Sequence, residues 1–182
     1  MATNIEVVLV NPEIPQNTGN ILRTCVGLGI RVNLIEPLGF KIDDKKLRRS
    51  AVDYYDSIDM RIYESLDAFI NENRGKYYYL TRYANKSYSE IDFKEDSEPI
   101  YLFFGSESYG IDRELLAENF NNTFRIPTND KIRSLNLSNT VAIVLYEAMR
   151  QNNFTGLELS EPESLKGSDY LRGFKTDGKE DK

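Results

Sequence analysis

Short apolar segments that alternate with helix-like segments constrain the fold of this 182-residue chain most strongly. Six segments rich in β-branched, leucine or aromatic residues are typical of buried strands, and they occupy residues 5–10, 31–37, 60–63, 76–82, 99–105 and 122–127. Between them, helical spacing predicts helices over residues 20–29, 43–55, 65–73, 111–120 and 140–151, and a polar loop over 83–98. This alternation predicts an α/β fold with a mostly parallel sheet and helices on both faces.

The length of the chain suits one domain with a substantial core. We place this domain at residues 1–156. The remainder, 157–182, is a polar tail rich in glycine, serine and charged residues, and about ten residues at its end are expected to be disordered.

Composition excludes several kinds of site. The chain has one cysteine, Cys25, and no histidine, which rules out an internal disulfide, a Cys/His metal site and a Ser-His or Cys-His nucleophile pair. We therefore expect no metal. No apolar run approaches the roughly 18 residues of a membrane span, and the N-terminus lacks the features of a signal peptide, so we expect a cytoplasmic protein without a membrane partner.

The charge of the chain is acidic overall but uneven. A net charge of −6 argues against broad binding to nucleic acid. Residues 41–49, "KIDDKKLRR", nevertheless carry five basic and two acidic residues, and Arg23, Arg31, Lys131 and Arg133 could extend a basic patch. The pattern fits either such a patch or an ordinary solvated helix face.

Three unusual loops follow predicted strands, where ligands bind in open α/β sheets. They are "NPEIPQNTGNILR" after 5–10, "GSESYG" after 99–104, and "IPTNDKIRSLNLSN" after 122–125. In the second loop, Gly105 permits close backbone approach and Gly110 a tight turn, whereas Glu107 would repel an anion. This loop is either a plain turn or a site for a neutral or cationic ligand.

The segments around Arg23 and "SLNLSN" each have two interpretations. We expect Asn17 or Thr18 to cap the first helix, so that Arg23 lies near its start, where a cation is unfavourable without a partner; otherwise it is a surface arginine. In "SLNLSN", Ser138 or Asn139 is expected to cap the last helix. The rest is then a turn, or a polar loop that holds a ligand.

Taken in order, these three loops resemble the three motifs of the SPOUT family of RNA methyltransferases. Within that family, "EIPQNTGNILR", "IEPLGF" and "DDKKLRRSAVDYY" resemble small single-domain enzymes that methylate the ribose 2′-hydroxyl of the wobble nucleotide of certain tRNAs. That nucleotide is at position 34, a cytidine or a carboxymethylaminomethyluridine. The resemblance covers residues 4 to 156.

The resemblance implies a C-terminal trefoil knot, a homodimer, and S-adenosylmethionine as the methyl donor. By matched motif position, it places the cofactor contacts at Leu80, Gly105, Ile126 and Ser134, with Glu107 and Gly110 in the same motif-two loop. It assigns catalytic or positioning roles to Arg23, Asn17, Ser134 and Asn136, with Arg23 acting at the partner subunit's cofactor. It implies RNA contacts, at the anticodon loop, for Arg133, Tyr146, Lys45, Lys46, Arg48 and Arg49, with the dimer interface as the alternative role of Tyr146.

The implied chemistry agrees with the composition, because methyl transfer from a sulfonium to a hydroxyl requires neither a metal nor a histidine. The pKa of a free guanidinium is too high for it to be a good base. Two roles therefore stay open for Arg23: the base, or a group that positions the hydroxyl or a phosphate. Ser106 stands where the family often has proline. Two alternatives remain: a SPOUT enzyme acting at another tRNA or ribosomal RNA position, and a nonenzymatic α/β nucleotide-binding module.

Overall fold

The computed structural model describes residues 4–42, 52–94 and 98–173, and its centre is one seven-stranded sheet. The strands are β1 (Ile5–Val10), β2 (Arg31–Ile35), β3 (Met60–Tyr63), β4 (Lys76–Leu80), β5 (Lys86–Ser87), β6 (Ile100–Phe104) and β7 (Thr123–Arg125). They lie in the order β3-β2-β1-β6-β4-β7-β5, and every neighbouring pair is parallel. The predicted α/β class and parallel sheet are confirmed.

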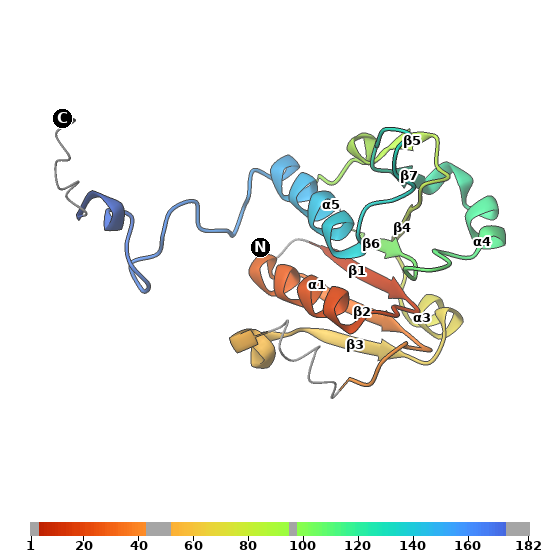
Figure 1. Ribbon diagram of the computed structural model, residues 1–182, viewed down its shortest axis with the longest axis horizontal. Coiled ribbons are helices and arrows are strands. Elements are labelled where there is room, and N and C mark those ends of the chain that lie inside the picture. The colour runs from red at the N-terminus through yellow and green to blue at the C-terminus, as the bar shows by residue number, and fades with distance from the viewer. Residues whose placement is uncertain (1–3, 43–51, 95–97, 174–182) are drawn as a thin grey trace.

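The helices cover both faces of this sheet. They are α1 (Pro15–Leu28), α3 (Leu66–Glu72), α4 (Arg113–Glu118) and α5 (Leu137–Gln151), with 3₁₀ turns at Val52–Ser57, Tyr88–Glu90, Phe120–Asn122 and Tyr170–Gly173. In Figure 1, α1 and α5 lie side by side in front of the sheet and α3 lies behind it.

Two separate apolar clusters explain this layering. Side chains alternate along a strand, so Val7 and Leu9 of β1 pack with α1 and α5, while Val8 and Val10 pack with Phe69 of α3 on the opposite face. β6 is buried along its whole length. It lies between β1 and β4, which places the ends of these three strands next to one another.

Several predicted boundaries are wrong for physical reasons. Helix α1 begins at Pro15 rather than at residue 20, because proline suits the first helical position, where its missing N–H costs nothing. The N-cap is Ile14, and neither Asn17 nor Thr18 caps the helix. The predicted end of this helix at Gly29 is confirmed, with φ of 64°.

The segment predicted as a polar loop, 83–98, also contributes to the fold. It contains β5, which pairs with β7, and its Ile91 and Phe93 are buried in the core on the side of α1 and α5. Most of the helix predicted at 43–55 lies outside the described residues, and its described end is a 3₁₀ turn.

The chain beyond Leu157 runs away from the body of the molecule as far as the 3₁₀ turn at Tyr170–Gly173 (Figure 1). The described part of this segment is mostly exposed, including Leu159, Leu165 and Leu171. The division of the chain at residue 156 remains a prediction. No helix among the described residues is long and apolar enough to cross a membrane.

Candidate functional site

A cavity of about 660 Å³ lies at the carboxyl ends of neighbouring strands β6, β4 and β7. This is the edge at which open α/β sheets bind ligands. All the positions predicted to contact a cofactor line it: Leu80, Gly105, Glu107, Gly110, Ile126 and Ser134. Asn17, Asn136 and Arg133 line it as well. The fold therefore brings together three loops that are far apart in the sequence.

The loop after β6 forms a compact wall of this cavity. The amide of Gly110 donates to the carbonyl of Ser106 at 2.9 Å, and the amide of Tyr109 donates to the Ser106 hydroxyl at 3.2 Å. Gly110 has φ of 76°, in the left-handed region that favours glycine. Ser106 is buried and supports the turn with its hydroxyl and its carbonyl.

A chain of side-chain hydrogen bonds joins the three motif loops. Nδ2 of Asn136 donates to Oδ1 of Asn17 at 3.0 Å, and Nδ2 of Asn17 donates to Oε1 of Glu107 at 2.8 Å. Asn17 is only 6% exposed, so its amide depends on these two partners. We call this set of three residues the loop latch.

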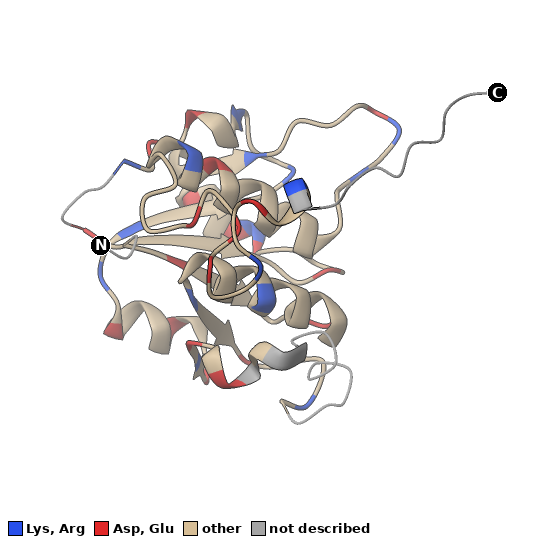
Figure 2. Cartoon of the chain, turned by 90° about the vertical axis from the view of Figure 1, so that its left-hand side faces the viewer, with Lys and Arg blue, Asp and Glu red and all other residues tan. Residues whose placement is uncertain are grey.

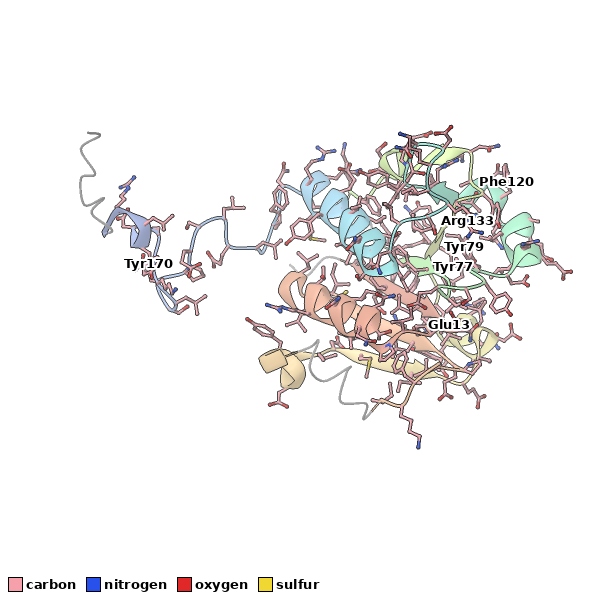
Figure 3. The ribbon with its side chains drawn as sticks, viewed as in Figure 1. Glu13, Tyr77, Tyr79, Phe120, Arg133 and Tyr170 are labelled. Carbon is pink, nitrogen blue, oxygen red and sulfur yellow. The ribbon has the colours of Figure 1, made fainter. Side chains whose placement is uncertain are left out.

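A second pair of contacts reinforces the latch. The amide of Glu13 donates to Oε2 of Glu107 at 2.9 Å, and the amide of Ser108 donates to Oε2 of Glu13 at 3.0 Å. Figure 3 labels Glu13 and Arg133, which belong to the first and the last of the three loops. Both carboxylate oxygens of Glu107 thus accept hydrogen bonds within the protein, which shows that this residue ties loops together.

Asn136 is also the N-cap of α5, which corrects the predicted caps at Ser138 and Asn139. Its side-chain oxygen accepts from the amides of Ser138 at 2.9 Å and Asn139 at 3.4 Å. The helix consequently begins at Leu137, three residues before the predicted start. One side chain serves both interpretations of "SLNLSN", since its oxygen caps the helix and its nitrogen joins the loop latch.

Arg23 does not line the cavity of its own chain. It lies well inside α1, which begins at Pro15, so the expected conflict with the start of the helix does not arise. Its guanidinium carbon lies 5.6 Å from the ring centroid of Tyr54. Arg23 is exposed, and so is Tyr146 on α5, which is likewise outside the cavity lining.

The remaining predicted RNA contacts divide between two groups. Arg133 lines the cavity and is exposed. Lys45, Lys46, Arg48 and Arg49 lie outside the described residues, so their role stays a prediction.

Among the described residues there is no cluster of histidine, cysteine, aspartate or glutamate that could hold a metal ion. Cys25 is buried, and burial raises the pKa of its thiol.

The loop after β4 lines the cavity beyond the predicted contact at Leu80. Thr81, Arg82 and Tyr83 line the cavity, as do Tyr109 and Arg113 from the chain around α4. Their position in the sequence could have identified Arg82 and Tyr83 as lining residues. Both directly follow a buried strand, at the edge of the sheet where the other motif loops meet. The predicted strand 76–82 concealed it, because β4 ends at Leu80.

The cavity is positively charged although the chain as a whole is acidic. Acidic and basic residues are interspersed over the fold (Figure 2), yet the described residues of the lining include four arginines and one carboxylate. The arginines are Arg82, Arg113, Arg125 and Arg133, and the carboxylate belongs to Glu107. Nε of Arg125 is buried without a hydrogen-bond partner among the described residues.

Comparison with known proteins identifies the family. The model of the SpoU rRNA Methylase family matches residues 4–146. The chain belongs to this family. The membership confirms the RNA methyltransferase family predicted from the three motifs, each of which contributes residues to one cavity.

Individual relatives of this SpoU methylase are similar over nearly their whole length. A Geobacillus stearothermophilus protein, provisionally named a tRNA (cytidine(34)-2′-O)-methyltransferase, is 48% identical over 154 residues, covering 84% of this chain and 98% of its own. A tRNA (cytidine(34)-2′-O)-methyltransferase from Saccharophagus degradans is 42% identical over 152 residues, covering 82% and 97%.

Solved structures share the fold. One, reported for 2-OH methylation of C/U34 on tRNA, superposes with a TM-score of 0.76 at 38% identity and covers 82% of this chain and 97% of its own. An rRNA methyltransferase from Sinorhizobium meliloti with AdoMet bound has a TM-score of 0.71 at 26% identity, covering 80% and 56%.

Proposed function

We propose that this SpoU methylase transfers a methyl group from S-adenosylmethionine to the ribose 2′-hydroxyl of the nucleotide at position 34 of certain tRNAs. One observation carries this function: the three motif loops of the family are joined by the loop latch around a single cavity. Relatives 42–48% identical carry names with the same reaction. Cytidine and carboxymethylaminomethyluridine are the proposed target nucleotides.

The cavity fits the cofactor in size and in its polar groups. A volume of about 660 Å³ lies within the range of small-molecule sites. Leu80, Gly105, Ile126 and Ser134 would hold the cofactor, in the loops that line the cavity. When bound, S-adenosylmethionine supplies an electrophilic methyl group on a positively charged sulfur.

The protein's own contribution is to position the target hydroxyl. Ser134 and Asn136 lie just before α5, and both are exposed residues of the cavity lining. The loop latch restrains Asn17 and Asn136 before any ligand arrives, which lowers the entropic cost of a reactive alignment. No histidine is present to act as a general base.

Arg23 completes the proposed site from the partner subunit. It lies outside the cavity of its own chain and on the exposed side of α1, where a second subunit would reach it. A homodimer, a trefoil knot in the C-terminal half of the domain and a cytoplasmic location form part of the same proposal. Their support is family membership and similarity to SPOUT methyltransferase structures.

A methyl-transfer assay tests the reaction. The purified protein is incubated with S-adenosylmethionine carrying a labelled methyl group and with tRNA that lacks the wobble methyl group. We expect label at the ribose of nucleotide 34. A tRNA with 2′-deoxyribose at that position is the matched control and should remain unlabelled. Label at another nucleotide, or none in any tRNA, contradicts the proposal.

A further inference from the structure

Two arginines flank a tyrosine at the rim of the cavity, and none of the three has a role in the function proposed above. The guanidinium carbon of Arg82 lies 4.7 Å from the ring centroid of Tyr83, and that of Arg113 lies 5.8 Å from it. Nη2 of Arg82 donates a hydrogen bond to the Tyr83 hydroxyl at 2.7 Å. We call these three residues the rim cluster.

The rim cluster is arranged to bind an anion. Because the Tyr83 oxygen accepts from Arg82, its own proton is free to be donated outward. Neither Arg82 nor Arg113 forms an ion pair with any described residue. The hydrogen bond from Arg82 and the charges of both arginines lower the pKa of Tyr83, which reflects a positive potential at this point.

Two anions could satisfy this chemistry: the carboxylate of the cofactor's methionine moiety and a phosphate of the RNA. The cofactor carries one carboxylate, whereas the lining has four arginines. The cluster is also open to solvent: Tyr83 is 49% exposed, and Tyr109, which lines the same cavity, is 88% exposed. Exposed aromatic rings next to cations are typical of sites for unpaired nucleotides, whose bases stack while phosphates pair with arginine.

We propose that Arg82, Tyr83 and Arg113 bind a backbone phosphate of the RNA strand next to the nucleotide that enters the cavity. The two guanidinium groups and the Tyr83 hydroxyl donate to the phosphate oxygens, and the ring of Tyr109 covers an adjacent unpaired base. This inference rests on the proposed function, and it explains how an acidic chain attracts RNA at one place.

The test measures binding to an anticodon stem-loop RNA over a range of salt concentrations. The double variant Arg82→Ala/Arg113→Ala should bind about tenfold more weakly or worse, since its charge-assisted hydrogen bonds to the phosphate are removed. The slope of log affinity against log salt should fall by about 0.7 for each phosphate of a single strand that the variant no longer neutralises. Tyr83→Phe, which removes only the hydroxyl, should weaken binding by a smaller factor.

A matched control removes the same charge elsewhere. Arg61 on β3 and Arg74 before β4 lie outside the cavity lining, so Arg61→Ala/Arg74→Ala should bind RNA nearly as the wild type does. Affinity for S-adenosylhomocysteine, which keeps the carboxylate, is measured in parallel by calorimetry and should be unchanged in both double variants.

Each outcome decides the matter. A loss of S-adenosylhomocysteine binding with RNA binding intact would assign the cluster to the cofactor carboxylate and overturn the inference. Unchanged RNA affinity and salt slope, or a wild type that binds no stem-loop, would overturn it as well. A wild type that binds RNA through Arg82 and Arg113 but methylates none refutes the proposed function alone.

Discussion

Gly105 shows how closely the cavity wall is packed. A Cβ atom at this position would lie 2.0 Å from the carbonyl carbon of Gly110 and 2.2 Å from the amide nitrogen of Ile111. Both neighbours are backbone atoms of the same loop, which cannot move aside as a side chain would. The smallest side chain therefore forces the loop after β6 to open.

Gly105→Ala should consequently lower both stability and cofactor binding. Overpacking of this kind costs about 1–3 kcal/mol, and the displaced loop should lose most of its affinity for S-adenosylhomocysteine. Thermal unfolding and calorimetry measure the two effects. Gly27→Ala in α1 is the control, because an added Cβ there would meet no side chain or other segment within 4 Å. It should stabilise the helix by about 0.5–1 kcal/mol. Equal behaviour of the two variants would contradict the argument.

Helix α5 depends on a side chain that belongs to the site. Asn136 caps its first turn through Oδ1 and joins the loop latch through Nδ2. The stability of an element and the shape of the cavity are therefore coupled through one residue.

Two substitutions at this position separate the two roles. Asn136→Ala should cost about 1 kcal/mol from the missing cap alone and should weaken cofactor binding. Asn136→Ser keeps a capping hydroxyl but cannot reach Asn17, so it should regain stability without regaining affinity. Ser65→Ala, which removes the cap of α3 at a distance from the cavity, should lower stability alone. Chemical denaturation and calorimetry provide the measurements, and full affinity in Asn136→Ser would show that the latch is dispensable.

The C-terminal end of α5 should make the stability of the fold depend on pH. Hydrogen bonds from Arg150 and then Gln151 lower the pKa of Glu147 from 4.5 to about 2. Because the pKa of Glu147 is lower in the folded protein than in the unfolded chain, these hydrogen bonds stabilise the fold above the unfolded pKa. Their contribution is lost as the pH falls toward about 2. Gln151 also donates to the carbonyl of Ile91 at 3.0 Å, so the loss reaches the segment that follows β5.

Glu147→Gln should therefore flatten the loss of stability between pH 4.5 and about 2, because the substituted residue has no proton to gain. Urea denaturation at several pH values tests this. Glu158→Gln, in the exposed segment after the domain, should leave the profile unchanged. A wild-type profile and a Glu147→Gln profile that run parallel would contradict the expectation.

Elements were predictable where one local signal dominated. Gly29 ends α1 as predicted, since glycine favours this position by itself. The predicted start of the helix at 65–73 is likewise close to the observed one, because serine favours the cap position that Ser65 takes. The start of α5 was misplaced because four polar residues competed for one cap, and only the distant partner Asn17 distinguishes Asn136 from its neighbours. The same limitation hid β5, which is two residues long and depends on β7 for its pairing.

At the scale of the whole molecule, we propose that the site is shared between two subunits. If Arg23 acts on the partner's cavity, then Arg23→Ala and Gly105→Ala damage different halves of one composite site. Each variant alone should be nearly inactive, although Arg23→Ala should still bind cofactor.

Mixing the two variants should restore activity. Random reassortment in a two-fold symmetric dimer makes half of the dimers mixed, each with one intact site, so about a quarter of wild-type activity is expected. Methyl transfer after co-refolding measures it, and circular dichroism checks that Gly105→Ala is folded. If the mixture stays inactive although mixed dimers form, Arg23 does not act in trans.

Strand order could not be read from the sequence, although it decides which loops meet. The alternation of strands and helices predicts a parallel sheet, but it does not predict that β6 pairs with β1 and β4 and that β4 pairs with β7. These pairings bring "NTGNILR", "GSESYG" and "SLNLSN" to one edge. The resemblance to a known family supplied what local patterns could not. It missed Arg82 and Tyr83 because these residues belong to none of its motifs.

The loop latch also has a consequence for the order in which the protein becomes competent. Asn17 leaves the ribosome well before Asn136, which precedes a helix that ends at Gln151. A growing chain therefore has no complete cavity until its last long helix has emerged and docked. Cofactor binding during translation would then begin only once α5 has packed onto the sheet. It would therefore indicate that the chain has been synthesised at least as far as Gln151.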